Sequence, residues 1–461
     1  MNKINFVTAQ ADNGQSFKVL IIGAGTGGAS LAHALKRANI AVAVFERDRT
    51  RATGREGYRV GISPDGSRFL HECLPSDLYD LFVATCARSP RYFNLLTEQM
   101  AESLSFSASE LPLGDDPIES EKTVNRSTLR QVLYTGLEDV LHFDKKFSHY
   151  EQNADGTVTA FFEDGSSATG HLLVAADGAN SGVRKQYLPQ ARLEECGILS
   201  MGGKMPMTAE ARALLTPKIL QGMTMIFAPK GFGFIIHVVE FGWDENGAKA
   251  NVNPRYAPLL NQWEGRQYDH PDDYIGWGFW ALQRHFPVDP LKLAGAELIA
   301  LTEQMIRNWH PNLRKLVAMS DPATVYPINI RTSVPLEPWM PSNVTLLGDA
   351  IHTMTPGRGA GANTAMRDAA VLCRKLVKAR DGKLSLLEAV GEYENEMRGY
   401  AYNLVRKSRE QMDSNDPIHK PVIGDLMLHT MRAGMKVANA VPPLKRRMAA
   451  AMFADRSSHD R

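Results

Sequence analysis

One glycine-rich segment of the chain has residue types and a spacing that suit the binding of a diphosphate. It reads Gly23-Ala24-Gly25-Thr26-Gly27-Gly28. In a GxGxxG pattern, the first glycine forms a tight turn, the second lets the backbone approach a pyrophosphate, and the third lets a helix pack on the sheet. The phosphates then bind unpaired N–H groups at the positive end of that helix. Gly23, Gly25 and Gly28 are therefore candidates for binding a dinucleotide.

The segments around this loop have the pattern of a parallel β-α-β unit that would position it. Residues 18–22 (KVLII) and 40–45 (IAVAVF) are apolar runs typical of buried strands, and residues 29–38 carry apolar side chains at helical spacing. Glu46 follows the second strand, 18 residues after Gly28. Its carboxylate can accept both hydroxyls of an adenosine ribose and would repel a 2′-phosphate. The pattern therefore predicts FAD or NAD rather than NADP.

A second carboxylate follows another apolar run. Residues 171–176 (HLLVAA) read as a buried strand that ends at Asp177-Gly178. A strand that stops at Asp-Gly and turns can present its carboxylate to a bound cofactor. An ordinary β-turn has the same sequence, so this segment taken alone favours the turn.

A third segment combines a strand, a carboxylate and a glycine loop. Residues 344–347 (VTLL) precede Gly348-Asp349, residues 353–363 (TMTPGRGAGAN) form the loop, and residues 364–376 read as a helix with an apolar stripe. A glycine loop that opens a helix presents N–H donors to a negative group. Asp349 at the end of its strand suits hydrogen bonds to a ribose or ribitol hydroxyl.

These three motifs, in this order, resemble those of the FAD-dependent aromatic hydroxylases, the class A flavoprotein monooxygenases of the p-hydroxybenzoate hydroxylase type. A fourth segment, residues 124–130 (VNRSTLR), is similar to the one that directs an arginine to the flavin. The resemblance extends from about Lys18 to about Leu376, and more weakly to Arg406. It implies a non-covalently bound FAD whose contacts are Gly23, Gly25, Gly28, Glu46, Arg47, Gly61, Arg126, Asp177, Asp349, Gly361, Ala362 and Asn363.

The resemblance also assigns these contacts to parts of the cofactor. Arg47 is expected near the adenine, and Gly61 lies in a strand that meets the flavin from the other side. Asp177 would serve both FAD and a transient nicotinamide, and Asp349 the sugar or ribitol chain. The N–H groups of residues 361–363 would face the flavin N1/O2 edge.

The implied activity is that of an NAD(P)H-consuming monooxygenase, which hydroxylates an aromatic or polyketide-like small molecule through a flavin C4a-hydroperoxide. Pro356 and Gly357 are the residues expected beside that peroxide. The small-molecule substrate, O2 and either NADPH or NADH are the expected partners. His237, Tyr326 and His285 are candidate general bases, although each such residue is more often packed or at the surface.

Three other functions fit the same motifs. A Baeyer–Villiger or epoxidising monooxygenase would keep the fold and change the oxygen transfer. A flavin-dependent reductase would omit oxygen transfer, and a non-catalytic flavoprotein would sense redox state or a ligand. No second GxGxxG segment marks a nicotinamide domain, so the choice between NADH and NADPH stays open, as does the oligomeric state.

The expected fold is α/β, a Rossmann-like FAD-binding domain of the p-hydroxybenzoate hydroxylase (GR2) type with an inserted substrate domain. We expect a flexible tail over residues 1–17, a discontinuous FAD-binding domain over 18–197 and 332–380, a β-sheet substrate domain over 198–331, and helices over 381–461. Alternation over residues 274–280 (YIGWGFW) would place Tyr274, Gly276, Gly278 and Trp280 on one face of that sheet. The C-terminal helices are expected to pack on the FAD-binding domain, with membrane docking as the alternative.

Composition narrows the remaining possibilities. The chain has 461 residues, of which 44% are hydrophobic, so it can build a core. The 52 Lys and Arg residues balance 51 Asp and Glu residues, which argues against nucleic acid as a partner. Its four cysteines form no CxxC pair, which argues against a metal site and against a disulfide framework. With no signal-like or membrane-spanning segment, we expect a cytoplasmic protein without membrane association.

Overall fold

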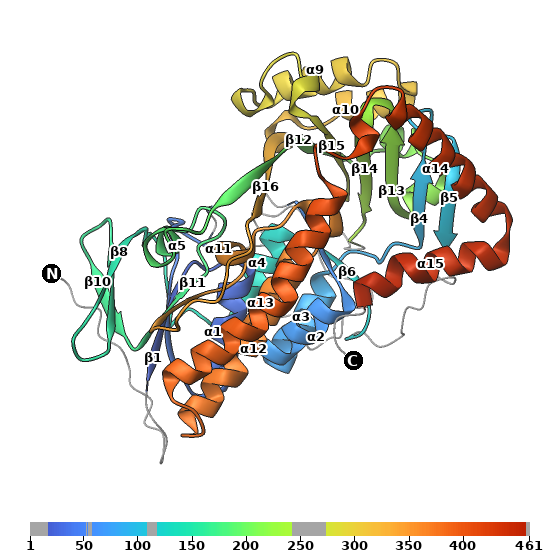
Figure 1. Cartoon of the computed structure of the whole chain (residues 1–461). Coiled ribbons are helices and arrows are strands. Elements are labelled where there is room, and N and C mark those ends of the chain that lie inside the picture. Colours follow the sequence, from blue (N-terminus) through green and yellow to red (C-terminus); the bar gives the residue numbers. More distant parts are fainter. Residues whose placement is uncertain (1–16, 52, 54–57, 108–117, 242–272, 458–461) are drawn as a thin grey trace.

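The structure is a computed structural model that describes residues 17–51, 53, 58–107, 118–241 and 273–457. The predicted N-terminal tail therefore lies outside the described residues except for its last position. The fold class is the predicted one: a parallel sheet and a larger mixed sheet stand side by side, with long helices across the first (Figure 1).

The first sheet has five parallel strands in the order β17-β11-β1-β2-β7. Its strands are β1 (Lys18–Ile22), β2 (Ala41–Phe45), β7 (Leu141–His142), β11 (Leu172–Ala175) and β17 (Val344–Leu346). The three longest apolar runs, β1, β2 and β11, are buried on both faces, as expected for strands covered by helices. Helices α1 (Thr26–Arg37) and α12 (Gly361–Arg380) pack together, and α12 also contacts α2 (Pro64–Cys73).

Two smaller sheets complete this side of the molecule. The antiparallel pair β3 (Arg59–Ile62) and β6 (Lys122–Asn125) leads directly into α4 (Arg126–Tyr134). Strands β8 (Phe147–Gln152), β9 (Val158–Phe162) and β10 (Ser167–Gly170) form a three-stranded sheet before β11. The pair β3-β6 is the one that bears on the site, because it places the start of α4.

The second large sheet has seven strands in the order β16-β12-β15-β14-β13-β4-β5. Five come from the region after residue 192: β12 (Leu193–Pro206), β13 (Gly222–Ala228), β14 (Phe232–Val239), β15 (Tyr274–Leu282) and β16 (Tyr326–Ser333). The other two, β4 (Tyr92–Leu96) and β5 (Glu102–Ser107), fall in the range predicted for the FAD-binding domain, yet β4 pairs with β13. The predicted division at residues 197 and 198 therefore does not follow the sheets, because pairing between distant strands leaves no local signature.

The two faces of this sheet differ, and the predicted alternation is confirmed. Ile275, Trp277 and Phe279 of β15 are buried in a core with α9 (Ala296–Met305) and α10 (Pro311–Ala318). Tyr274, Gly276, Gly278 and Trp280 lie on the other face. The last three are only half-buried, whereas Tyr274, at the start of the strand, is buried with Phe241. We call this second face the inner face.

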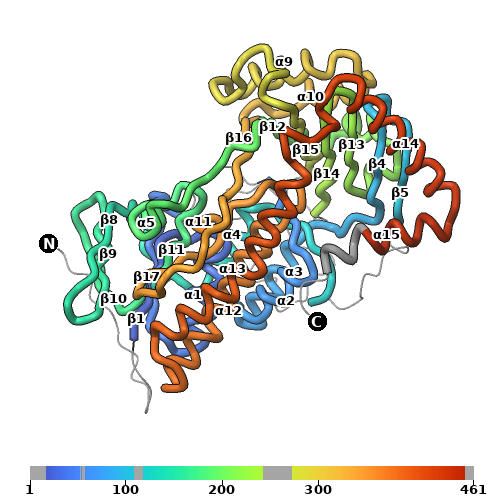
Figure 2. The backbone as a smooth tube through the Cα atoms, in the orientation of Figure 1, coloured from blue at the N-terminus to red at the C-terminus, as the bar shows by residue number. Residues whose placement is uncertain are grey.

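The C-terminal helices divide between the two sheets (Figure 2). Helix α13 (Leu386–Gln411) packs along α12, as predicted. Helices α14 (Ile423–Ala440) and α15 (Pro442–Ser457) instead lie against β4, β5 and β13, where Ala438 and Ala449 join Phe93 and Phe106 in one apolar cluster. The prediction that these helices pack on the FAD-binding domain is therefore wrong for α14 and α15, because the apolar surface of β4 and β5 requires a cover.

Candidate active site

The glycine loop between β1 and α1 separates packing glycines from one that faces open space. Gly23 has φ +100°, and a Cβ there would lie 2.4 Å from the Ala176 carbonyl oxygen. A Cβ on Gly28 would lie 2.1 Å from the Gly23 oxygen. A Cβ on Gly25, the N-cap of α1, would meet nothing within 4 Å. The backbone at Gly25 is therefore accessible to a group that binds at the helix N-terminus.

Glu46 lies buried at the end of β2, beside this loop. Its Oε2 accepts a hydrogen bond from the Ala24 N–H at 2.7 Å, and its Oε1 accepts one from Asp48 N–H at 3.1 Å. Each carboxylate oxygen has a second lone pair, so both retain acceptor capacity for ribose hydroxyls. The next residue, Arg47, has an exposed side chain.

Asp177 follows β11 and lies next to the glycine loop. Its Oδ2 accepts a hydrogen bond from Gly182 N–H at 2.8 Å. Its Oδ1 is buried without a hydrogen-bond partner among the described residues, and burial raises the pKa of this carboxyl. A buried acceptor of this kind normally has a partner, which a bound ligand or water would supply.

Asp349 begins the short helix α11 (Asp349–His352) after β17. Its side chain is accessible to solvent, although the surrounding protein raises its pKa by desolvation. Both observations fit a carboxylate that lines accessible space within the fold. The charge of Arg126 acts on Asp349 and lowers its pKa in part, and a Cβ on Gly361 would lie 3.8 Å from Asp349 Oδ1. The starts of α4, α11 and α12 therefore converge here.

Arg126 connects this region with the seven-stranded sheet. Its guanidinium lies over the Tyr58 ring, 5.2 Å from the centroid. The Tyr58 ring in turn lies 6.3 Å from that of Tyr326, at the start of β16. Of the three candidate bases, Tyr326 is therefore the one that is connected to a predicted FAD contact, Arg126, through the ring of Tyr58.

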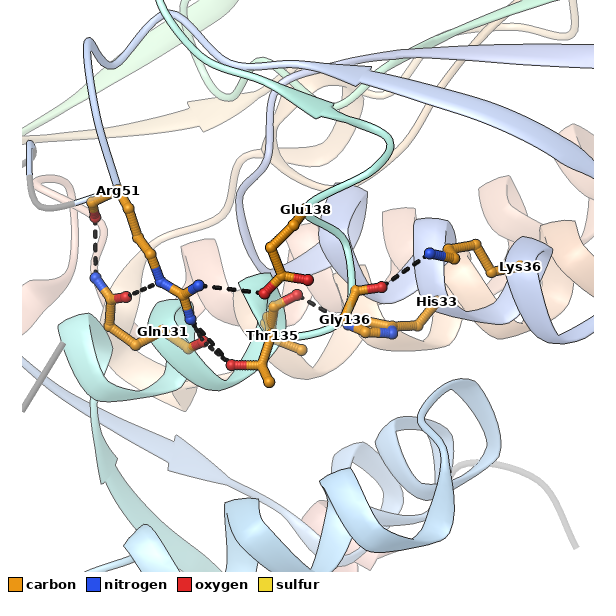
Figure 3. Close-up of polar contacts among 8 residues, drawn as sticks. His33, Lys36, Arg51, Gln131, Thr135, Gly136 and Glu138 are labelled. Carbon is orange, nitrogen blue, oxygen red and sulfur yellow. Dashed lines mark hydrogen bonds and ion pairs between the residues drawn. The ribbon is translucent and has the colours of Figure 1, made fainter. Parts of the chain in front are cut away.

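The far half of α4 is anchored to two other segments (Figure 3). Arg51 donates from Nε to Gln131 Oε1 at 2.5 Å, and from Nη2 to the Gln131 carbonyl and to Thr135 Oγ1, both at 2.9 Å. Lys36 of α1 donates to the Gly136 carbonyl at 2.9 Å. These contacts fix α4, whose first residue is Arg126.

The first turn of α12 is held against β3 by Asn363. Its Oδ1 accepts from Ser63 N–H at 2.9 Å, and its Nδ2 donates to the Gly61 and Gly359 carbonyls at 3.1 and 3.0 Å. The side chain of Asn363 therefore joins the two segments that were predicted to meet the flavin from opposite sides. The N–H groups of residues 361–363 belong to a first helical turn, which provides them with no carbonyl partners.

Pro356 and Gly357 lie in an exposed turn before α12. Thr355 Oγ1 donates to the Ser408 carbonyl at 2.6 Å, and a Cβ on Gly357 would lie 3.3 Å from Met412 Cγ. The turn therefore packs against the end of α13. Met412 belongs to an apolar cluster against which Trp280 of the inner face packs, so the turn and the inner face are neighbours.

A buried polar cluster that the sequence did not lead us to expect holds the residues on either side of Asp349. Asp368 of α12 accepts from Gly348 N–H at 2.7 Å, lies 2.6 Å from His352 Nε2, and accepts from Tyr400 Oη at 2.5 Å. Burial alone would lower the pKa of His352, but the Asp368 carboxylate outweighs it and the net pKa is raised. The sequence did carry a signal, because Arg367 and Asp368 are charged residues within the apolar stripe of a predicted helix.

The other two candidate general bases, His237 and His285, lie in different surroundings. His237 lies on the inner face, where it is paired with Gly276. His285 packs its ring against Phe232, 5.4 Å between centroids, and burial lowers its pKa.

Within the described ranges, no group of three or more His, Cys, Asp and Glu side chains could hold a metal ion. None of the helices described there has the length and apolar character that a membrane crossing requires.

A family model and a solved structure both match this chain. The family model described as an FAD binding domain matches residues 300–408. A solved structure, assigned as an FAD-containing monooxygenase of Photorhabdus luminescens, is 30% identical and superposes with a TM-score of 0.72, covering 86% of this chain and 99% of that one.

Two groups of curated relatives differ in length. A dual O-methyltransferase/FAD-dependent monooxygenase of Cercospora beticola is 32% identical over 428 residues, which are 88% of this chain but 47% of that protein. The chain thus spans about half the length of such relatives. An FAD-dependent urate hydroxylase of Klebsiella pneumoniae is 29% identical over 404 residues, covering 86% of this chain and 90% of that protein.

Proposed function

Because the chain belongs to the FAD-dependent monooxygenase family, we propose that it hydroxylates an aromatic or polyketide-like small molecule at the expense of NAD(P)H and O2. The observation that carries this proposal is the half-open inner face of the seven-stranded sheet, which includes Tyr326. The Tyr326 ring lies next to that of Tyr58, over which Arg126 is placed, and the charge of Arg126 acts on Asp349. Aromatic side chains on such a face suit a flat, apolar substrate.

The chemistry of the donor and acceptor groups fits FAD. The open backbone at Gly25 and the start of α1 would hold the pyrophosphate, and Glu46 would hold the adenosine ribose. Asp349 and the unpartnered Oδ1 of Asp177 offer acceptors for hydroxyl groups. Arg126 and the first turn of α12 offer positive charge and N–H donors for the electron-rich edge of the flavin. Arg47, Gly61 and residues 361–363 stay predictions for the same cofactor.

When bound, FAD supplies the redox and oxygen-transfer chemistry, and the protein supplies position and shielding. The cluster of Asp368, His352 and Tyr400 holds the turn at Gly348 and so orients Asp349. Asn363 holds the start of α12 against β3. Both devices set the cofactor site before a substrate enters, which lowers the cost of ordering it later.

The substrate would lie between the inner face and the turn at Pro356 and Gly357. Trp280 would form one wall, and Gly276 and Gly278 would leave room beside it. In this proposal, Tyr326 would exchange a hydrogen bond with a phenolic hydroxyl and so hold the substrate in position.

Labelled oxygen tests the proposal. The purified protein, loaded with FAD, is incubated under 18O2 with NADPH or NADH and a panel of phenols, polyketides and urate, and products are analysed by mass. One labelled oxygen atom added to an aromatic carbon supports hydroxylation. A labelled lactone, ester or epoxide would replace it with another oxygen transfer, and a reduced product without label would favour a reductase. Nicotinamide oxidation that is unchanged by every compound would contradict substrate hydroxylation within the panel.

A further inference from the structure

The segment that follows β2 is fastened to helix α4 at two points. We call residues 46–51 the β2 loop; its first residue is the predicted acceptor for the adenosine ribose. Near the middle of the loop, Asp48 Oδ2 accepts a hydrogen bond from Arg130 Nη2 at 2.6 Å. At its end, Arg51 donates to Gln131 Oε1 at 2.5 Å (Figure 3). Helix α4 therefore sets the path of the β2 loop.

A single hydrogen bond joins the ion pair of Arg130 and Asp48 to the Glu46 carboxylate. Asp48 donates its backbone N–H to Glu46 Oε1 at 3.1 Å, so the residue that Arg130 holds is itself a donor to that carboxylate. The other carboxylate oxygen, Oε2, accepts from the Ala24 N–H of the glycine loop at 2.7 Å. The position of the Glu46 carboxylate is therefore set from two sides, by the glycine loop and by Asp48.

The charges in this cluster depend on the guanidinium of Arg130. Glu46 and Asp48 are two residues apart, and the side chains of Arg130 and Asp48 are 16% and 24% exposed, so solvent screens them only in part. Arg130 also donates from Nε and Nη2 to Tyr134 Oη at 3.0 and 2.8 Å. Burial raises the pKa of Tyr134 to about 12, and the charges of Glu46 and Asp48 act in the same direction. Tyr134 is therefore a neutral partner, and Arg130 is the cation that offsets the repulsion between the two carboxylates.

We propose that Arg130 is a positioning residue for the adenosine half of FAD, because through Asp48 it holds the Glu46 carboxylate ready to accept from a ribose. This inference rests on the FAD site proposed above. A carboxylate that is held in place before the ligand arrives loses less conformational freedom on binding. Arg126, one helical turn earlier on α4, is the predicted contact at the flavin half. One helix then positions both halves of the cofactor, each through its own arginine.

Binding of the two halves of FAD to the full-length apoprotein tests this inference. Isothermal titration gives the dissociation constants of ADP, which contains the adenosine ribose, of FMN, which contains the flavin, and of FAD. Arg130→Gln should weaken ADP and FAD by about tenfold each and leave FMN unchanged, because only the ribose acceptor loses its support. A helix that is merely loosened would weaken FMN as well, since Arg126 belongs to α4.

Two further variants locate the effect. Asp48→Asn removes the same ion pair, so the double variant with Arg130→Gln should bind ADP no more weakly than the weaker of the two single variants. Lys36→Met is the matched control, because Lys36 of α1 anchors the other end of α4 by donating to the Gly136 carbonyl, and it should bind ADP as the wild type does. Far-UV circular dichroism verifies that each variant is folded.

Four results would overturn the inference. They are an Arg130→Gln protein that binds ADP as tightly as the wild type, equal losses for ADP and FMN, additive losses in the double variant, and a loss of ADP binding in Lys36→Met that matches the loss in Arg130→Gln. A wild-type apoprotein that binds neither FAD nor its halves would contradict the FAD site itself, and the inference with it.

Discussion

The glycine loop of the parallel sheet and the inner face of the seven-stranded sheet differ in the atoms that surround their glycines. A methyl group added to a glycine shows the difference. At Gly23 and Gly28 it would strike backbone oxygens at 2.4 and 2.1 Å. At Gly276 and Gly278 its nearest neighbours are side-chain atoms at 3.4 and 3.1 Å. Backbone cannot yield locally, whereas side chains can change rotamer. The glycine loop is therefore built to one geometry, and the inner face at Gly276 and Gly278 leaves room for adjustment.

Polar groups follow the same division. Behind the parallel sheet, Asp368, His352 and Tyr400 form a buried network in which each distance is 2.7 Å or less. On the inner face, Trp280 and His237 are half-buried. A buried and connected network gives a unique arrangement, and a half-open face can accept different occupants. We therefore expect substitutions behind the parallel sheet to change the free energy of unfolding, and substitutions on the inner face to change the KM for a substrate.

The largest expected effect on stability is at Asp368. Asp368→Asn would leave the buried His352 without its counter-charge and should lower the free energy of unfolding by about 3–5 kcal/mol. Tyr400→Phe removes one hydrogen bond of the same carboxylate and should cost about 1 kcal/mol. Urea unfolding measures both. Equal losses in the two variants would show that the ion pair adds nothing beyond hydrogen bonding.

The glycine loop offers a pair of matched substitutions. Gly28→Ala should lower the free energy of unfolding by about 1–3 kcal/mol, because its Cβ overlaps backbone. Gly25→Ala places its Cβ in open space, so it should leave stability within about 1 kcal/mol and weaken FAD binding instead. Thermal unfolding of the apoprotein and FAD titration separate the two. The comparison fails if Gly25→Ala binds FAD as tightly as the wild type.

The pH dependence of stability tests a buried carboxyl group that packs against the parallel sheet. Burial raises the pKa of Glu394 to about 7 from its ordinary value of 4.5, and the Thr345 hydroxyl of β17 donates to it at 2.8 Å. A raised folded-state pKa gives stability that is present below 4.5 and lost as pH rises to about 7. Glu394→Gln should remove that slope and be more stable than the wild type at pH 8 by about 1–3 kcal/mol. Parallel profiles for the two proteins would contradict the assignment.

The smallest expected effect on stability is on the inner face of the seven-stranded sheet, where we propose that the substrate binds. Tyr326→Phe should leave the free energy of unfolding within about 1 kcal/mol and raise KM for a phenolic substrate by about tenfold, because one hydrogen bond is lost. Gly278→Ala should likewise be tolerated, since its Cβ would meet Ile235 Cγ2 at 3.1 Å and the nearest backbone atom, Met201 O, at an ordinary contact distance of 3.9 Å. Steady-state kinetics and thermal unfolding check both. A loss of stability like that of Gly28→Ala would remove the distinction between the two sheets.

Local sequence patterns were enough to predict the parallel sheet, the glycine loop, and the carboxylates at the ends of strands. Each depends on a local pattern, since a buried strand, a turn and a helix start leave their mark within about ten residues. Gly23 and Gly28 play the predicted packing roles, and Glu46 and Asp349 lie at the predicted strand ends. The roles of the predicted FAD contacts and of Pro356 and Gly357 stay predictions.

The contacts between segments that are distant in the chain could not be predicted and became visible in the folded molecule. Asn363 bonds to Ser63 across 300 residues, Tyr58 lies beside Tyr326, and β4 joins β13. Helix α14 covers β5 for the same reason, since an apolar strand surface must be buried by whatever element reaches it. Such contacts depend on the sum of packing choices along the whole chain. No short stretch of sequence specifies them, because each partner's pattern is equally compatible with many others.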